Sequence, residues 1–158
     1  MKVQSAQEAL FVACEMERGA IQLYERALML LKQLGRQKEP LYAQMASILA
    51  DEKQHLAQFQ ELYTGLEDAL EQRLSLSAVA SDVLFPGGLM GAARQGLLSD
   101  ERGMLQFAAE AEEAAAATYR SFAAQSGDAH AAEMLTGIAL EEDKHLRTLR
   151  EHQASLGR

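Results

Sequence analysis

The sequence predicts an all-α fold, a bundle of four long helices built from two helical hairpins that a long crossover joins. Its 158 residues include only two prolines, and Ala, Leu, Glu and Gln are abundant, which is a composition typical of helices. Apolar residues also recur at the three- and four-residue spacing of one helix face. We expect a single domain, 1–158, with helices at about 5–34, 40–63, 99–125 and 128–153 and a crossover at 66–98.

The first hairpin is bounded by residues that favour helix starts and stops. Ser5 can cap the first helix, because Glu8 follows three residues later as the partner in a capping box. Gly35 favours the end of this helix, and Pro40 suits the first turn of the second helix. The short loop between the two helices makes them antiparallel neighbours.

The second hairpin and the crossover have similar signals. Ser99, followed by two acidic residues, favours the start of the third helix. A turn is expected at 126–128, where Asp128 can cap the fourth helix. The crossover is expected to hold a short helix at about 66–74 and then a loop built on Pro86, Gly87 and Gly88. Its apolar residues either cover the chain's own core or contact a second copy: Leu84, Phe85, Leu89, Met90, Leu97 and Leu98.

Charge and hydropathy exclude several classes of protein. The formal net charge is −8, which argues against nucleic-acid binding because that function needs a basic face. No apolar stretch approaches the ~18 residues of a membrane span, and the N-terminus does not resemble a secretory signal. Cys14 is the only cysteine, so we expect no disulfide framework and a reducing, cytoplasmic location.

Each of the four helices carries a glutamate inside its apolar stripe. Steps of three, four and seven residues from Glu17 reach only residues suited to a core, whereas Glu15 shares its face with polar residues. By the same test Asp51 faces solvent. His130 and His152 lack a glutamate three residues before them, and we expect them at the surface. The residues that this pattern points inward are Glu17, Glu52, His55, Glu112, Glu142 and His145.

Six buried ionisable groups need strong compensation. An unpaired buried charge costs several kcal/mol, whereas a whole domain is stable by only ~5–15 kcal/mol. Two divalent cations would balance four carboxylates, and two neutral imidazoles would complete their coordination. A single buried Glu-His pair can instead satisfy itself by a hydrogen bond, and a metal-free helical interaction module is the remote alternative for the whole set.

The two halves of the chain repeat each other. Tyr24 follows Glu17 by seven residues, and Tyr119 follows Glu112 by the same interval. The first glutamate precedes the Glu-x-x-His pair by 35 residues in the first half (17 to 52) and by 30 in the second (112 to 142). A duplicated helical hairpin places two equivalent half-sites around a pseudo-twofold axis. The repeat therefore predicts a two-metal site.

On these residues the chain resembles the rubrerythrin branch of the ferritin-like di-iron family over both hairpins. That superfamily takes one Glu from each of two helices and Glu-x-x-His from each of the other two. The resemblance implies terminal ligands at Glu17 and Glu112, bridging ligands at Glu52 and Glu142, and nitrogen ligands at His55 and His145. It also implies that Tyr24 and Tyr119 hydrogen-bond to ligand carboxylates of the opposite half, although tyrosines that simply pack in the core fit the pattern equally well.

The chain departs from the family pattern in three respects, and one of them is a connection between the hairpins that is longer than usual. Rubrerythrins usually carry a further glutamate on the third helix, where this chain has Ala115 and Ala116, so iron movement that depends on that carboxylate is not expected. A rubredoxin-like domain needs four cysteines, and Cys14 stands alone. Electrons are therefore expected from a separate donor, such as a rubredoxin-type protein.

The resemblance implies a reaction at two iron ions. Carboxylate oxygens with one imidazole for each metal suit iron, with manganese as the second choice. The expected activity is reduction of hydrogen peroxide to water, with peroxide or dioxygen as the partner molecule. The alternatives are a ferroxidase and a non-enzymatic protein that binds or delivers iron. A homodimer is also expected, since ferritin-like hairpins commonly pair through apolar faces.

Overall fold

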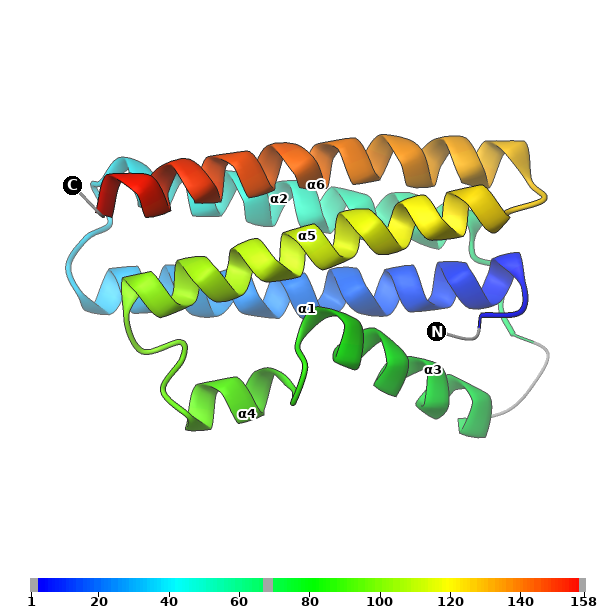
Figure 1. Cartoon of the computed structure of the whole chain (residues 1–158), viewed down its shortest axis with the longest axis horizontal. Coiled ribbons are helices and arrows are strands. Elements are labelled where there is room, and N and C mark those ends of the chain that lie inside the picture. Colours follow the sequence, from blue (N-terminus) through cyan, green and yellow to red (C-terminus); the bar gives the residue numbers. More distant parts are fainter. Residues whose placement is uncertain (1–2, 67–69, 157–158) are drawn as a thin grey trace.

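Four long helices lie side by side as a bundle (Figure 1). The computed structural model describes residues 3–66 and 70–156, and every regular element within those ranges is a helix. The all-α bundle expected from the sequence is therefore confirmed. The bundle helices are α1 (Ala6–Gln33), α2 (Pro40–Leu62), α5 (Glu101–Gln125) and α6 (Ala129–Leu156).

The helix ends are set by side-chain caps and by one left-handed glycine. Ser5 Oγ accepts a hydrogen bond from the Glu8 amide at 3.1 Å and so caps α1. Gly35, with φ of 72°, ends this helix, because a residue without a Cβ adopts that conformation at little cost. At the start of α5 the expected cap, Ser99, is wrong. Asp100 caps the helix instead, accepting from the Gly103 amide at 2.7 Å.

The crossover holds more helix than the sequence predicted. It contains α3 (Leu70–Leu84) and α4 (Leu89–Arg94), whereas one short helix at 66–74 was expected. Residues 67–69 of that expected helix lie outside the described part of the chain. The helix continues past 74 because Leu76, Ala80 and Leu84, spaced by four residues, are all buried.

The crossover covers one side of the bundle, where α3 packs against α1 and α5 (Figure 1). Leu84, Phe85 and Leu89 are buried in this chain's own core, whereas Met90 and Leu97 remain 54% and 45% exposed. Most of the crossover's large apolar side chains therefore cover the bundle to which they are attached.

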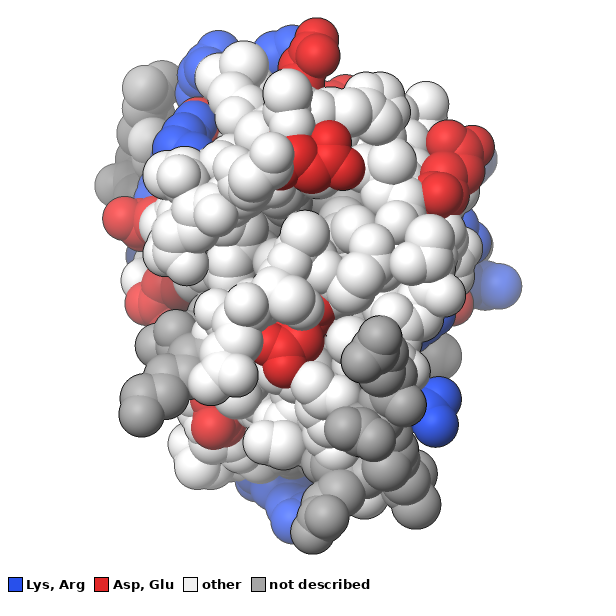
Figure 2. Space-filling model, turned by 90° about the vertical axis from the view of Figure 1, so that its right-hand side faces the viewer, with Lys and Arg blue, Asp and Glu red and all other residues white. Residues whose placement is uncertain are grey.

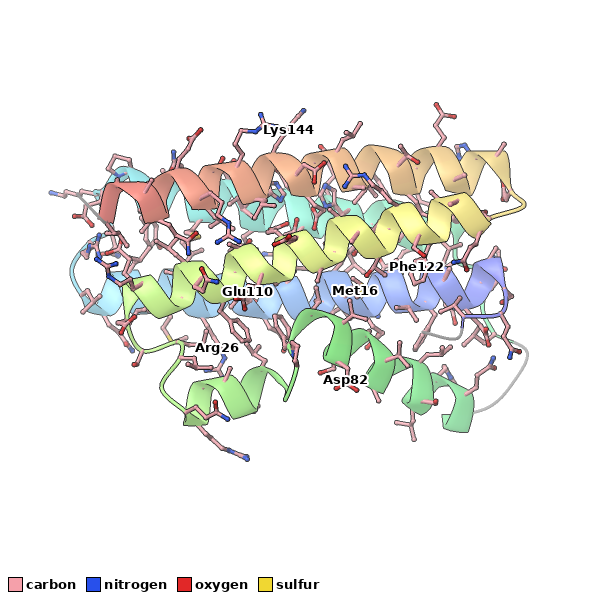
Figure 3. The ribbon with its side chains drawn as sticks, viewed as in Figure 1. Met16, Arg26, Asp82, Glu110, Phe122 and Lys144 are labelled. Carbon is pink, nitrogen blue, oxygen red and sulfur yellow. The ribbon has the colours of Figure 1, made fainter. Side chains whose placement is uncertain are left out.

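The sides of the helices divide between core and solvent as the helical spacing requires. Met16 and Phe122 lie in the interior, whereas Lys144 extends away from the outer face of α6 (Figure 3). Arg26 reaches from α1 toward α4, where it contacts the sulfur of Met90 (Figure 3). In the described ranges no helix has both the length and the apolar character needed to span a bilayer.

One end of the bundle, where α1 begins and α5 turns into α6, faces the viewer in Figure 2. Acidic side chains are scattered over this end, and the Lys and Arg side chains in view lie toward its edge. A hollow of about 400 Å³ opens here between the start of α1 and the α5–α6 turn. Its lining includes none of the six polar residues that the sequence pattern places in the core.

Candidate metal centre

Six ionisable side chains meet in the middle of the bundle, and they are the six that the sequence pattern points inward. Each is at most 6% exposed. Their ligand atoms form two overlapping groups, and within each group these atoms lie within 4.8 Å of one another. The cluster draws on all four bundle helices: Glu17 from α1, Glu52 and His55 from α2, Glu112 from α5, and Glu142 and His145 from α6.

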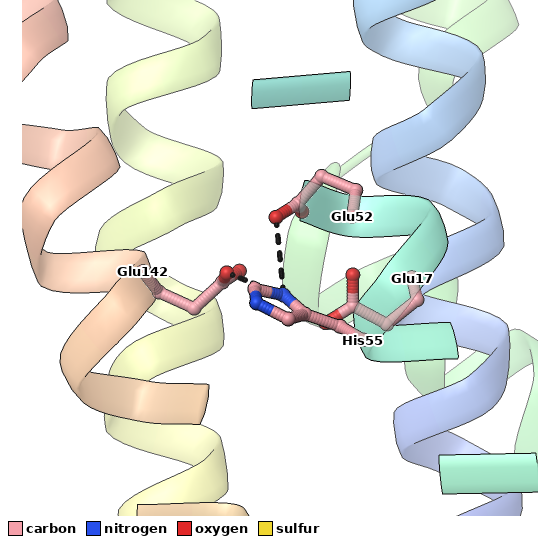
Figure 4. Close-up of side chains that lie close together, drawn as sticks. All are labelled: Glu17, Glu52, His55 and Glu142. Carbon is pink, nitrogen blue, oxygen red and sulfur yellow. Dashed lines mark ion pairs between the residues drawn. The ribbon is translucent and has the colours of Figure 1, made fainter. Parts of the chain in front are cut away.

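The first group surrounds His55 (Figure 4). Its Nδ1 atom lies 3.1 Å from Glu142 Oε1, 3.3 Å from Glu52 Oε1 and 3.6 Å from Glu17 Oε1. Glu142 reaches toward the imidazole from the opposite side of the bundle (Figure 4). One nitrogen and three carboxylates therefore face a common point.

The second group repeats this arrangement around His145. Its Nδ1 atom lies 3.2 Å from Glu52 Oε1 and 3.5 Å from both Glu112 Oε1 and Glu142 Oε1. Glu52 and Glu142 belong to both groups. The two imidazole rings are stacked with their centroids 6.0 Å apart. This is the geometry of two adjacent half-sites that share a pair of carboxylates.

The outer nitrogen of each histidine contacts a carboxylate that the sequence analysis assigned no role. His145 Nε2 lies 2.9 Å from Asp51 Oδ2, and His55 Nε2 lies 2.8 Å from Glu141 Oε2. Asp51 and Glu141 are about half-exposed, so Asp51 lies toward solvent as expected and in addition contacts His145. The signal that could have identified them is the acidic residue that directly precedes both Glu52 and Glu142.

These contacts orient both imidazoles. When the imidazole is neutral, a carboxylate beside Nε2 favours the tautomer that carries its proton there, which leaves the Nδ1 lone pair able to bind a metal ion. Carboxylates in this position are common behind metal-binding histidines. The geometry therefore aims both Nδ1 atoms at the centre of the cluster as potential metal ligands.

The two buried tyrosines link the hairpins through the same carboxylates. Tyr24 Oη donates to Glu112 Oε1 at 2.5 Å, and Tyr119 Oη donates to Glu17 Oε1 at 2.9 Å. Each tyrosine thus bonds to a carboxylate of the opposite half. Burial and the neighbouring carboxylates, among them Glu52, raise the pKa of both phenols well above the ordinary value. Both hydroxyls therefore stay protonated and act as donors at neutral pH.

The cluster leaves hydrogen-bonding capacity unused. Seven buried side-chain atoms have no hydrogen-bond partner among the described residues, and all seven belong to the six clustered residues. They include both oxygens of Glu52 and Nδ1 of both histidines. A buried polar atom without a partner costs about 1–3 kcal/mol, and a cation at the centre would satisfy several at once. These donor atoms fit divalent metal ions.

Burial and mutual repulsion shape the titration of the carboxylates. Burial, together with the charge of Glu52, raises the pKa of Glu17 and Glu112, and burial with the charges of Glu112 and Glu52 raises that of Glu142. Glu52 differs, because the two histidines outweigh the effect of burial and lower its pKa to about 2. Glu52, which belongs to both groups, is the most readily ionised of the four carboxylates.

The pKa values of the two clustered histidines are shifted in the direction that favours the charged imidazolium form. Burial acts to lower the pKa of His55, but Glu142, Glu17 and Glu52 outweigh it and raise the pKa above the ordinary value. The pKa of His145 is raised in the same way by Glu112, Glu142 and Glu52. Protons on these imidazoles therefore occupy the position that a metal ion would take.

Comparison with known families agrees with this geometry. A family model described as Rubrerythrin matches residues 8–153 of the chain. The matched range contains nearly all of both hairpins and every member of the buried cluster. Comparison with curated proteins and with solved structures gives no match.

Proposed function

The chain belongs to the rubrerythrin family, and on that premise we propose that it is a di-iron protein that reduces hydrogen peroxide to water. The balanced reaction joins one hydrogen peroxide, two electrons and two protons to give two water molecules. When bound, two iron ions would supply one electron each and a positively charged surface for the oxidant. Manganese is the second choice for the same ligand set.

The observation that carries the proposal is the sharing of Glu52 and Glu142 between two otherwise separate groups. Glu17 and His55 would hold one metal ion, and Glu112 and His145 would hold the other. Glu52 and Glu142, which belong to both groups, would help to hold both ions. Four carboxylates match the four positive charges of two ferrous ions, so the buried site would be close to neutral.

The protein's own residues orient the ligands and keep the site dry. Tyr24 and Tyr119 donate hydrogen bonds to Glu112 and Glu17 and so hold each carboxylate in place. Asp51 and Glu141 accept hydrogen bonds from Nε2 of His145 and His55 and so orient the imidazoles. Because all six clustered side chains are at most 6% exposed, bulk water is largely excluded from the reacting centre.

The electrons would come from a separate one-electron carrier, such as a rubredoxin-type protein. We place the reaction in the cytoplasm and expect the protein to work as a homodimer. The single cysteine, Cys14, and the acidic charge balance support a reducing environment and a partner other than nucleic acid.

The test is peroxide turnover by the iron-loaded protein with a rubredoxin, a rubredoxin reductase and NADH. We expect NADH consumption that requires both peroxide and iron, and that is lost in Glu52→Ala. Glu110→Gln is the matched control, because Glu110 is an exposed carboxylate on α5 (Figure 3) whose side chain, among the described residues, accepts a hydrogen bond from Gln106 alone. Iron oxidation by dioxygen without peroxide turnover would favour the ferroxidase, and bound iron without either activity would favour a delivery protein.

A further inference from the structure

We infer that Leu84, the last residue of the crossover helix α3, limits the size of the oxidant that can reach the buried carboxylates. The inference rests on the proposed function, because it concerns which peroxides that reaction accepts. It assigns the crossover a part in substrate selection.

A small cavity lies beside the cluster, and its volume is about 10 Å³. Glu52, Glu112 and Glu142 contribute to its walls. A cavity of this size holds about one water molecule. A space this small leaves no room for an attached carbon chain.

Leu84 closes this cavity from outside the bundle. Every other lining residue belongs to α1, α2, α5 or α6, whereas Leu84 comes from α3. Leu84 is itself only 4% exposed, so its isobutyl group separates the cavity from solvent on that side. The bulky apolar lining residues Met16 and Leu23 belong to α1, and Ala111 and Ala115 of α5 are small, so Leu84 is the bulky lining side chain that the crossover contributes.

The position of Leu84 is held by packing against two bundle helices. A Cβ atom at Gly19 of α1 would lie 3.2 Å from Leu84 Cδ1 and 3.0 Å from Phe85 Cε2, so the crossover approaches α1 closely at this glycine. Phe85 stacks on Phe107 of α5 with ring centroids 5.3 Å apart and an interplanar angle of 10°. Phe85, the next residue, is packed between α1 and α5. Leu84 therefore has little freedom to move away from the cavity.

The consequence is selection by size. Reduction of an alkyl hydroperoxide uses the same electrons as the proposed reaction: one hydroperoxide, two electrons and two protons give one alcohol and one water. The alkyl group, however, must occupy space beside the carboxylates. In this structure the side chain of Leu84 fills that space, so hydrogen peroxide is preferred to alkyl hydroperoxides.

The test compares Leu84→Ala with Leu76→Ala. Leu76 is a leucine on the same helix, it is 5% exposed, and it does not line the cavity. The ratio of kcat/KM for tert-butyl hydroperoxide to that for hydrogen peroxide should rise by about tenfold or more in Leu84→Ala. It should keep the wild-type value in Leu76→Ala. An unchanged ratio in Leu84→Ala would overturn the inference.

A second measurement does not depend on turnover. Crystals of the iron-loaded proteins under xenon pressure should show a xenon atom in the space that the Leu84 side chain vacates in Leu84→Ala, and none there in the wild type or in Leu76→Ala. The apolar lining residues include Met16, Ala20, Ala111 and Ala115, and an apolar space of sufficient size binds xenon. If the wild type reduces no peroxide while this xenon site appears, the proposed function fails and the size limit stands. If no xenon binds there in Leu84→Ala, the size limit is wrong. Should Leu84→Ala fail to fold, Leu84→Val supplies a smaller enlargement, with the same two outcomes.

Discussion

Asp51 Oδ2 lies 2.9 Å from His145 Nε2 and so joins the first hairpin to the second directly behind the buried cluster. Glu141 and His55 form the corresponding contact in the other direction, at 2.8 Å. The two bonds are related by the duplication of the hairpin, and each fixes the tautomer of one imidazole. The carboxylates on the surface of α2 and α6 thus extend the site to the outside of the bundle.

Removing the charge behind an imidazole should weaken metal binding without unfolding the protein. Asp51→Asn and Glu141→Gln should each lower the affinity for ferrous iron by about 10–100-fold, because the ligand histidine loses the carboxylate that orients it. Competition with a chelator under anaerobic conditions measures the change. Glu110→Gln serves as the control, and an affinity equal to that of the wild type in both variants would refute this role.

Tyr119→Phe should destabilise the protein and leave two metal sites. The substitution deprives Glu17 of its hydrogen-bond donor, and an unpaired buried acceptor costs about 1–3 kcal/mol. Urea denaturation of the metal-free protein measures this loss in the free energy of unfolding. Tyr42→Phe is the comparison, since Tyr42 is only partly buried at the edge of the core. Equal stability of the two variants would show that the Tyr119 hydroxyl contributes nothing.

Metal loading should release protons. The carboxylates raise the pKa of His55 and His145, so both imidazoles hold protons at neutral pH until a cation replaces them. Burial raises the pKa of Glu17 and Glu142 in the same direction. Anaerobic addition of ferrous iron to weakly buffered protein should therefore acidify the solution, and iron affinity should fall as the pH is lowered. Binding with no pH change would contradict these pKa directions.

Cys14 should react slowly with alkylating reagents. It is 2% exposed, and burial raises the pKa of its thiol to about 11. The thiolate is the reactive form. At pH 8, three pH units below this pKa, only about one Cys14 side chain in a thousand would be a thiolate. Iodoacetamide labelling followed by mass spectrometry should be slow in the folded protein, become faster as the pH rises toward 11, and become rapid in urea. Rapid labelling of the folded chain at pH 8 would indicate that this part of α1 opens.

The sequence was sufficient to place the clustered side chains on the inner faces of the helices. The helix period alone gives this result. Residues three and four positions from Glu17 or Glu142 lie on the same helix face as the glutamate, and all of them are suited to the core. The cross-hairpin bonds of Tyr24 and Tyr119 followed from the resemblance to a known family. Whether any of these residues binds metal stays a prediction.

The parts that the sequence analysis missed depend on contacts between distant segments. Asp51 shares its helix face with polar residues, and its contact with His145 exists only because α6 passes beside it. The length of α3 depends on burial of Leu76 and Leu84 against the bundle, which outweighs the weak local preference of its serines for helix. At the start of α5, Ser99 and Asp100 can each cap a helix, and Asp100 is the residue that binds the Gly103 amide.

The most direct test of the central claim is the iron content of the protein after anaerobic ferrous loading and gel filtration, measured for the wild type, Glu52→Ala and Glu110→Gln. We expect two iron ions per chain in the wild type and in Glu110→Gln, and a loss of both in Glu52→Ala, because Glu52 belongs to both groups of clustered residues. Wild-type protein that retains no iron, or Glu52→Ala protein that retains both ions, would contradict it.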